Sequence, residues 1–199
     1  MLKTILFDLS ETVISGLIGI EIPLASRLGV AEARILPAFG GDLLPRLCRG
    51  ELTEDQYLAL VLERQGWEIS PDELKQVLRG NFQRIVPGMW ELLNSLSTRY
   101  ELVVLSDHAR EWVAYIQVVH PELVLFKRQL YSFESGLLKS EPGTFTDALR
   151  SLDRKADECL FVDDNPVNVT AAEDAGLNGI RFVGAEDLKL ELVGRGIDQ

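Results

Sequence analysis

Residues 3–12 read KTILFDLSET, and the abrupt change from apolar residues to an acid at Asp8 decides how the chain is interpreted. The apolar run lacks the two-residue alternation of a strand with one wet face, which is typical of a strand covered on both faces. Asp8 therefore stands at the carboxyl end of a buried strand. Ligands of open α/β sheets bind at that end, so Asp8 is a candidate functional residue.

Other segments repeat this pattern of a short apolar run with polar residues at its end. We predict strands at residues 101–106 (ELVVLS), 158–163 (ECLFVD) and 179–183 (GIRFV), and a weaker one around 123–131. Helical patterns at residues 90–97, 109–118, 144–152 and 167–175 separate them. This alternation predicts an α/β fold with a parallel sheet. Asp8, Ser106 and the pair Asp163-Asp164 should then meet at one edge of the sheet.

The segment between the first two predicted strands is about 90 residues long, far more than a crossover needs. Capping-box patterns at residues 53–56 and 70–73 predict helix starts within it, and Gly66 and Gly80 are predicted helix stops. We therefore expect a helical insertion on the sheet. The predicted domains are an α/β core of residues 1–15 and 85–199 and a helical cap of residues 16–84.

Composition narrows the class of protein. The chain has 199 residues, of which 46% are hydrophobic and 26% charged, which is ordinary for a globular enzyme. There is no apolar run of the ~20 residues that a membrane span needs, no secretory signal pattern and no CxxC motif. We expect a cytoplasmic protein. The net charge of −11, without a run of lysines or arginines, argues against nucleic-acid and membrane partners.

Four stretches occur in an order that resembles a known family. They are ILFDLSET (5–12), LVVLSDH (102–108), SGLLKSEPGTF (135–145) and CLFVDDNPVNVTAAEDAG (159–176). Together they resemble the motifs of the haloacid dehalogenase (HAD) superfamily of hydrolases, most of which are phosphatases. The resemblance covers nearly the whole chain. It implies a Rossmannoid parallel sheet flanked by helices, with an inserted small helical cap.

The resemblance also implies a magnesium site and a nucleophile. Asp8 would attack phosphorus and form an aspartyl-phosphate. Asp8, the backbone carbonyl of Ser10 and Asp164 would bind Mg²⁺, and Asp163 would hold a metal-bound water or support the other ligands. Elementary electrostatics agrees, because several carboxylates at one place are costly without a cation, and a phosphate monoester repels an anionic nucleophile.

Three further residues have roles by resemblance. Lys139 would bind the phosphate and stabilise charge that develops during transfer. The Ser106 hydroxyl and the backbone N–H of Asp107 would donate to phosphate oxygens. The expected partner is a small phosphorylated substrate, and the sequence names neither that substrate nor the oligomeric state.

Ser10 departs from the family pattern. The usual phosphatase of this family has a second acid at this position, which protonates the leaving alcohol and later activates water. A serine hydroxyl lacks a suitable pKa for general acid catalysis, although its backbone carbonyl can still bind metal. The sequence offers Glu11 and His108 as other sources of the proton.

Three interpretations follow from Ser10. The first is a working phosphatase that uses solvent or another acid, or a substrate whose leaving group needs little help, such as an anomeric sugar phosphate or an acyl phosphate. The stretch GELTEDQY (50–57) favours it, because it resembles the cap of glucose-1-phosphate phosphatases and epoxide hydrolase N-terminal phosphatase domains, some of which also lack the second acid. The second is a degenerate protein that binds metal and a phosphorylated ligand or partner. The third is a haloacid dehalogenase, which needs no metal and so leaves Asp163 and Asp164 unexplained.

We therefore predict a Mg²⁺-dependent phosphatase of a small phosphorylated metabolite, for which a sugar phosphate is one candidate. Its catalytic residues would be Asp8 and Lys139.

Overall fold

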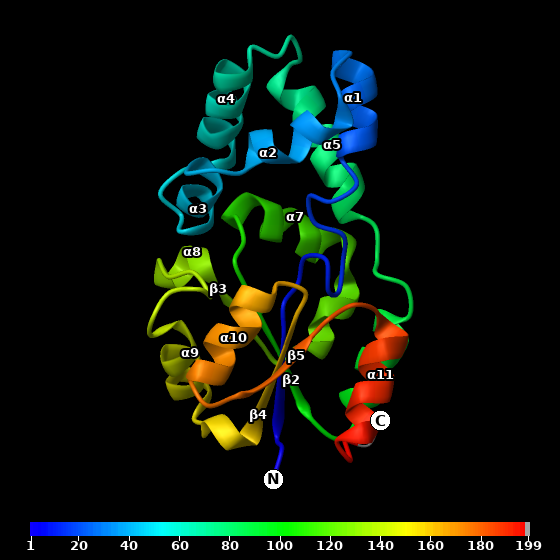
Figure 1. The fold of residues 1–199 in the computed structure, drawn as a ribbon, viewed down its shortest axis with the longest axis vertical. Helices are drawn as coiled ribbons and strands as arrows, with labels where there is room; N and C mark the ends of the chain where they lie inside the picture. The colour runs from blue at the N-terminus through cyan, green and yellow to red at the C-terminus, as the bar shows by residue number, and fades with distance from the viewer. Residues whose placement is uncertain (198–199) are drawn as a thin grey trace.

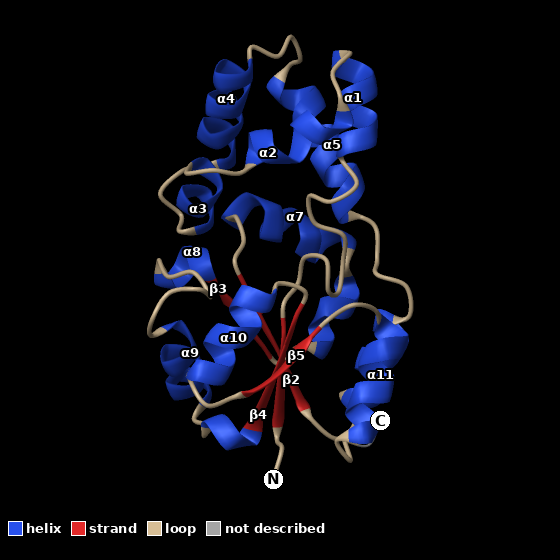
Figure 2. Ribbon diagram, viewed as in Figure 1, coloured by secondary structure: helices blue, strands red, loops and turns tan. Residues whose placement is uncertain are grey.

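The computed structural model describes residues 1–197, and its centre is a five-stranded parallel sheet (Figures 1 and 2). The strand order is β3-β2-β1-β4-β5. The strands are β1 (Thr4–Phe7), β2 (Glu101–Ser106), β3 (Arg128–Tyr131), β4 (Cys159–Asp163) and β5 (Asn178–Arg181). This arrangement confirms the predicted α/β class, including the weak strand that ends at Tyr131.

The register brings the polar strand ends together. Phe7 pairs with Val104 of β2 on one side of β1 and with Val162 of β4 on the other. The residues that follow these pairs, Asp8 and Asp163 among them, therefore leave the sheet at the same edge. Both β1 and β4 are buried along their whole length, which accounts for their uninterrupted apolar sequences.

Helices cover both faces of the sheet. On one face α6 (Met89–Leu96), α7 (Arg110–Val119) and α11 (Ala185–Gly194) pack against alternate strand residues such as Ile5 and Phe7. On the other face α9 (Thr144–Leu152) and α10 (Pro166–Asp174) pack against Leu6 and its neighbours. The short elements are the helix α8 (Ser132–Ser135) and the 3₁₀ segments Glu32–Arg34, Pro121–Leu125 and Ala156–Glu158.

The insertion forms a layer of helices above the carboxyl ends of the strands (Figure 1). Its helices are α1 (Glu21–Leu28), α2 (Ile35–Phe39), α3 (Leu43–Cys48), α4 (Glu54–Gln65) and α5 (Pro71–Phe82). We call α1 to α5 the helical cap. Among residues 1–197, none of the helices has the length and apolar character needed to cross a bilayer.

The predicted helix starts in the cap are confirmed, and one of the two predicted stops is wrong. Capping boxes at Thr53 and Ser70 begin α4 and α5, and Gly66 ends α4 with a left-handed φ of 63°. However, α5 continues through Gly80 to Phe82. The reason is tertiary: the amide of the buried Asn81 donates to the carbonyl oxygens of residues 16 and 18, which holds the last turn against the chain that enters the cap.

Candidate active site

Lys139 is buried between two carboxylates at the edge of the sheet. Its Nζ lies 2.7 Å from Asp8 Oδ1 and 2.6 Å from Asp163 Oδ2, and Lys139 is only 2% exposed. Burial alone would lower the pKa of Lys139, but the surrounding carboxylates outweigh it and raise the pKa above its usual value. The lysine is therefore a fixed positive charge beside Asp8.

The loop that carries Lys139 is held by side chains at two consecutive backbone N–H groups. The Asp107 carboxylate accepts the Lys139 N–H at 3.0 and 3.2 Å, so the residue after Ser106 positions the lysine backbone. Glu141 accepts the N–H of the preceding residue, Leu138, at 2.7 Å. These contacts explain how a loop residue presents its ammonium group at a defined place.

The carboxylates of Asp8, Asp163 and Asp164 form a cluster in which one oxygen of each lies within 4.8 Å of the others. Burial raises the pKa of all three above the ordinary value of 3.8, as expected where carboxylates crowd away from water. An all-oxygen set of this charge fits Mg²⁺, which prefers hard oxygen ligands. The backbone hydrogen bonds of the turn after β1 run to Leu9 O and Ile14 O, which leaves the Ser10 carbonyl out of them.

Asp163 and Asp164 differ in their surroundings. Asp163 accepts hydrogen bonds from the Asn165 N–H (2.8 Å), the Asn168 amide (3.0 Å) and Lys139 Nζ. Asp164 is half-buried and has no salt bridge to another residue within 1–197. Asp164 is thus better placed to bind a cation directly, and Asp163 to orient its neighbours.

Asn168 is a site residue that we did not predict from the sequence. It is buried one turn into α10, and its amide holds Asp163. The signal was present, because Asn165 caps α10 by accepting the Val167 N–H at 3.0 Å. A residue three positions after the cap points back towards the strand end from which the helix starts.

Ser106 ends β2 beside this cluster. It is 1% exposed; its hydroxyl lies close enough to the Asp8 carboxylate to lower the pKa of that group, but it makes no hydrogen bond of good geometry within residues 1–197. A buried hydroxyl without a partner costs free energy, so such a group commonly marks a place where a ligand completes the hydrogen bonds. This matches the predicted contact of Ser106 with a phosphate oxygen.

The structure brings Ser10 into contact with His108. Ser10 Oγ lies 3.2 Å from His108 Nε2, although the residues are 98 positions apart. His108 is 2% exposed, and its Nδ1 accepts the Ala109 N–H at 3.1 Å. Burial lowers the pKa of His108 to about 4, so the ring is neutral near pH 7.

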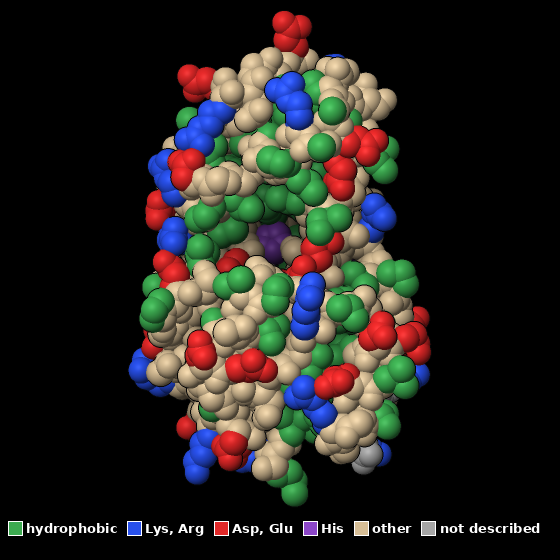
Figure 3. All heavy atoms as spheres, viewed as in Figure 1, with side chains coloured by type: hydrophobic (Ala, Val, Ile, Leu, Met, Phe, Trp, Pro, Cys, Tyr) green, Lys and Arg blue, Asp and Glu red, His purple; other side chains and the backbone are tan. Residues whose placement is uncertain are grey.

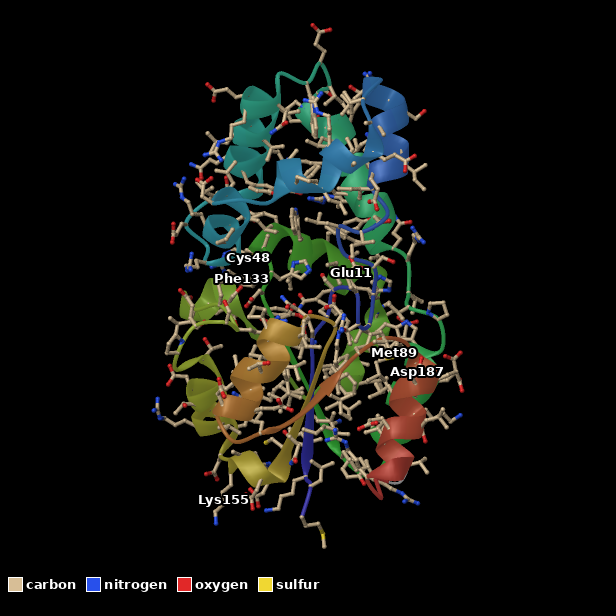
Figure 4. The ribbon with its side chains drawn as sticks, viewed as in Figure 1. Glu11, Cys48, Met89, Phe133, Lys155 and Asp187 are labelled. Carbon is tan, nitrogen blue, oxygen red and sulfur yellow. The ribbon has the colours of Figure 1, made fainter. Side chains whose placement is uncertain are left out.

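Glu11 is engaged in holding the chain that leads into the cap. Its Oε1 accepts the N–H groups of Gly16 and Ile18, both at 2.9 Å, and its own φ is 60°. Burial raises the pKa of Glu11. Figure 4 shows Glu11 on one side of the space between cap and sheet and Cys48 and Phe133 on the other.

A hollow separates the helical cap from the sheet (Figure 3). Hydrophobic side chains gather on its cap side, and a histidine side chain lies at its floor. The cap is fastened to the core beside the hollow, because Ser132 Oγ donates to the Cys48 carbonyl at 2.6 Å and Arg49 pairs with Glu141 at 2.7 Å. At the other contact the buried Glu54 of α4 accepts from Trp112 Nε1 of α7 at 2.9 Å.

Comparison with known proteins decides the family. A family model described as haloacid dehalogenase-like hydrolase matches residues 2–176. The chain belongs to this family. The HAD resemblance drawn from the four motifs is therefore confirmed, and the chain is a HAD-like hydrolase.

Individual relatives of this HAD-like hydrolase are distant. A curated protein named flavin mononucleotide hydrolase 1, chloroplastic, from Arabidopsis thaliana is 23% identical over 99% of this chain and 79% of its own length. A predicted HAD-like hydrolase from Porphyromonas gingivalis has a TM-score of 0.78 at 23% identity, with both chains covered fully. A HAD family enzyme from Bacteroides thetaiotaomicron, solved with magnesium and inorganic phosphate, has a TM-score of 0.76 at 19% identity and covers 94% of this chain and 97% of that one. The solved structures share the fold.

Proposed function

We propose that this HAD-like hydrolase is a Mg²⁺-dependent phosphatase that acts on a small phosphorylated metabolite through an aspartyl-phosphate on Asp8. The observation that carries the proposal is the buried Lys139 ammonium, 2.7 Å from Asp8 and 2.6 Å from Asp163, together with the buried Ser106 hydroxyl, which makes no well-formed hydrogen bond among the described residues. A positive charge and a free donor next to a carboxylate suit a doubly charged phosphoryl group.

The metal ligands would be Asp8, the Ser10 carbonyl and Asp164, with Asp163 behind them. The cluster spacing of 4.8 Å or less and the all-oxygen donors support this assignment. Bound there, Mg²⁺ would neutralise charge on the phosphoryl oxygens and so reduce their repulsion of the nucleophile. The Bacteroides thetaiotaomicron neighbour, which was solved with magnesium and phosphate, makes the same metal a reasonable first choice.

The residues of the chain divide the chemistry between them. A carboxylate oxygen of Asp8 attacks phosphorus, and the bond from phosphorus to the leaving oxygen breaks. Lys139, Ser106 and the Asp107 N–H bind the transferred oxygens. Water then attacks the aspartyl-phosphate, which releases inorganic phosphate and restores the Asp8 carboxylate.

The cap limits the substrate to a small molecule. Helices α3 and α4 are fastened to the core by Arg49–Glu141 and Glu54–Trp112, so a protein loop has little access to Asp8. Sugar phosphates are candidates through the resemblance of residues 50–57 to the glucose-1-phosphate phosphatase cap. Flavin mononucleotide is another, through the name of the Arabidopsis relative.

Phosphate release with Mg²⁺ tests the proposal. The panel contains sugar-1-phosphates, sugar-6-phosphates, flavin mononucleotide and acetyl phosphate, assayed with native protein, Asp8→Asn and the surface control Asp157→Asn. We expect turnover that needs Mg²⁺, falls at least about 10³-fold in Asp8→Asn and is unchanged in Asp157→Asn.

Three outcomes would contradict the proposal. Turnover that persists in Asp8→Asn would exclude the Asp8 phosphoenzyme. A native protein that is silent on the panel, with activity appearing in Ser10→Asp, would support a degenerate binding protein instead. Chloride release from a 2-haloacid that resists chelation would support a dehalogenase.

A further inference from the structure

Ser10 lies two residues after Asp8 in the sequence, and its side chain forms a hydrogen-bonded pair with His108. We propose that the Ser10 hydroxyl, oriented by His108, donates a hydrogen bond to the leaving-group oxygen without transferring a proton, so that the enzyme selects phosphates whose leaving group departs as a stable anion. Acyl and aryl phosphates are this class of substrate. The inference rests on the proposed phosphatase activity.

The hydrogen bonds of the imidazole assign the direction of this contact. His108 Nδ1 accepts the Ala109 N–H at 3.1 Å, so in the neutral ring the proton resides on Nε2. Nε2–H therefore donates to Ser10 Oγ at 3.2 Å. The Ser10 proton is not needed for this contact and is free to donate to a ligand.

The surroundings fix the ring and leave the hydroxyl accessible. His108 is 2% exposed and lies edge-on to Phe82 and Trp112, with ring centroids 6.2 and 5.8 Å apart. Its backbone N–H donates to Ser132 Oγ at 3.0 Å. Ser10, by contrast, is half-buried, so the hydroxyl is the end of the pair that a substrate can reach. His108 is accordingly a positioning residue for Ser10.

Glu11, the acidic residue next to Ser10, uses its carboxylate to accept backbone hydrogen bonds. Glu11 Oε1 accepts two backbone N–H groups at 2.9 Å, and these bonds hold the chain that enters the cap. A hydroxyl in this position can stabilise developing negative charge, as donors of an oxyanion hole do. It does not provide the ~10²–10⁴-fold that general acid–base catalysis typically contributes.

The reaction balances without a protein proton donor. As Asp8 attacks, the electron pair of the breaking P–O bond stays on the leaving oxygen, which departs as an anion hydrogen-bonded to Ser10. A carboxylate or phenolate is stable in this form and needs no proton at once. An alkoxide, as would leave from flavin mononucleotide or a sugar-6-phosphate, is far more basic and takes its proton from water only after leaving. Water then hydrolyses the aspartyl-phosphate, and its proton passes to phosphate or solvent.

A leaving-group series tests the inference. We would measure kcat/KM for substituted phenyl phosphates of graded phenol acidity, with acetyl phosphate and flavin mononucleotide at the extremes. This parameter reports phosphorylation of Asp8 and not the later hydrolysis. For native protein we expect log(kcat/KM) to fall steeply as the leaving group becomes more basic. Ser10→Asp should flatten the slope and raise activity on flavin mononucleotide at least about 10-fold.

Further variants separate positioning from folding. Ser10→Ala should lower kcat/KM on aryl phosphates by about 10- to 100-fold, and His108→Asn should lower it to a similar degree. The kcat/KM of the double variant should be no lower than that of Ser10→Ala, because both changes disable the same hydrogen bond from Ser10 to the leaving group. Ser97→Ala, on the surface at the end of α6, should leave the slope unchanged. If His108→Asn fails to fold, the Ser10 variants alone still decide the slope.

Each failure has its own meaning. A native slope equal to that of Ser10→Asp, or a preference of the native protein for alkyl phosphates, would overturn this inference and leave the proposed phosphatase intact. Absence of Mg²⁺-dependent turnover on the whole series would overturn both.

Discussion

Arg49 and Glu141 form a salt bridge with Nη2 and Oε1 2.7 Å apart, and this contact joins the helical cap to the loop that carries Lys139. Glu141 also accepts the Leu138 N–H at 2.7 Å, one residue before the lysine. A movement of the end of α3 away from the core would therefore separate Arg49 from Glu141, the side chain that holds the Leu138 N–H. The cap and the Lys139 loop are thus joined through a single carboxylate.

Breaking this contact should reduce catalysis more than stability. Because both side chains are partly exposed to solvent, which screens their attraction, the pair adds little to stability. We expect Arg49→Ala to lower kcat/KM by about 2- to 5-fold. Arg46→Ala is the matched control, since Arg46 lies three residues earlier, in α3, and pairs with Glu51 at 3.4 Å. Equal effects of the two variants, or full additivity of Arg49→Ala with Glu141→Ala, would contradict the coupling.

Lys139→Met should affect both activity and folding. The substitution leaves the buried Asp8 and Asp163 carboxylates without their cation, and breaking a buried pair typically costs about 3–5 kcal/mol. We expect turnover to fall at least about 100-fold and the denaturation midpoint near pH 7 to fall clearly. Added Mg²⁺ should recover part of the stability. If metal-free Lys139→Met were as stable as metal-free native protein, Lys139 would not be needed to offset repulsion between the Asp8 and Asp163 carboxylates.

Asp164→Asn should raise the stability of the metal-free protein and remove most of its stabilisation by Mg²⁺. Burial raises the pKa of Asp164 above 3.8 in the folded protein. The stabilising effect of its protonation is full below the ordinary pKa and is lost as pH rises through the raised value. Metal-free Asp164→Asn should thus melt above native protein at pH 7.5, and this difference should shrink towards pH 4. The stabilisation by Mg²⁺ should nearly vanish in Asp164→Asn and persist in Asp157→Asn; equal Mg²⁺ shifts in both would refute the metal assignment.

Lowering the pH should destabilise the folded protein through His108, whereas protonation of Asp164 stabilises it. Burial lowers the pKa of His108 from 6.5 to about 4, so its stabilising effect is present above pH 6.5 and is lost as pH falls towards 4. The shift corresponds to about 3 kcal/mol. Urea unfolding of native protein and His108→Gln at pH 7 and pH 4 should therefore give free energies of unfolding that converge at the lower pH. A constant difference between them would mean that the imidazole is not held neutral.

Glu54→Ala should loosen the cap at its second attachment. Glu54 is 3% exposed and accepts from Trp112 Nε1 at 2.9 Å and from the partly exposed Arg79 at 2.6 Å, so its loss leaves the buried Trp112 N–H without a partner. We expect a loss of about 3 kcal/mol. Asp55→Ala, one residue along at a largely exposed position, should cost less than about 1 kcal/mol. Hydrogen exchange in α4 should accelerate in Glu54→Ala, and unchanged exchange would count against this attachment.

Local signals were sufficient for much of the fold. The central strands β1, β2 and β4 are short apolar runs that end at or just before a polar residue, and each of the two capping boxes joins residues three positions apart. Both patterns are therefore complete within a few residues of sequence. The polar strand ends then indicated where a site had to be, because parallel strands present their carboxyl ends at one edge. Asp8, Ser106 and Asp163 were identified in this way.

Contacts between distant segments could not be predicted from such patterns. The sequence alone determined the strands with their polar ends, the helix starts of α4 and α5, and the departure at Ser10. Only the tertiary structure decided that Ser10 meets His108 and that α5 continues past Gly80. The physical reason is that each of these depends on how elements pack against one another, since a hydrogen bond across 98 positions exists only after the sheet order and the seating of the cap have brought its two ends within reach.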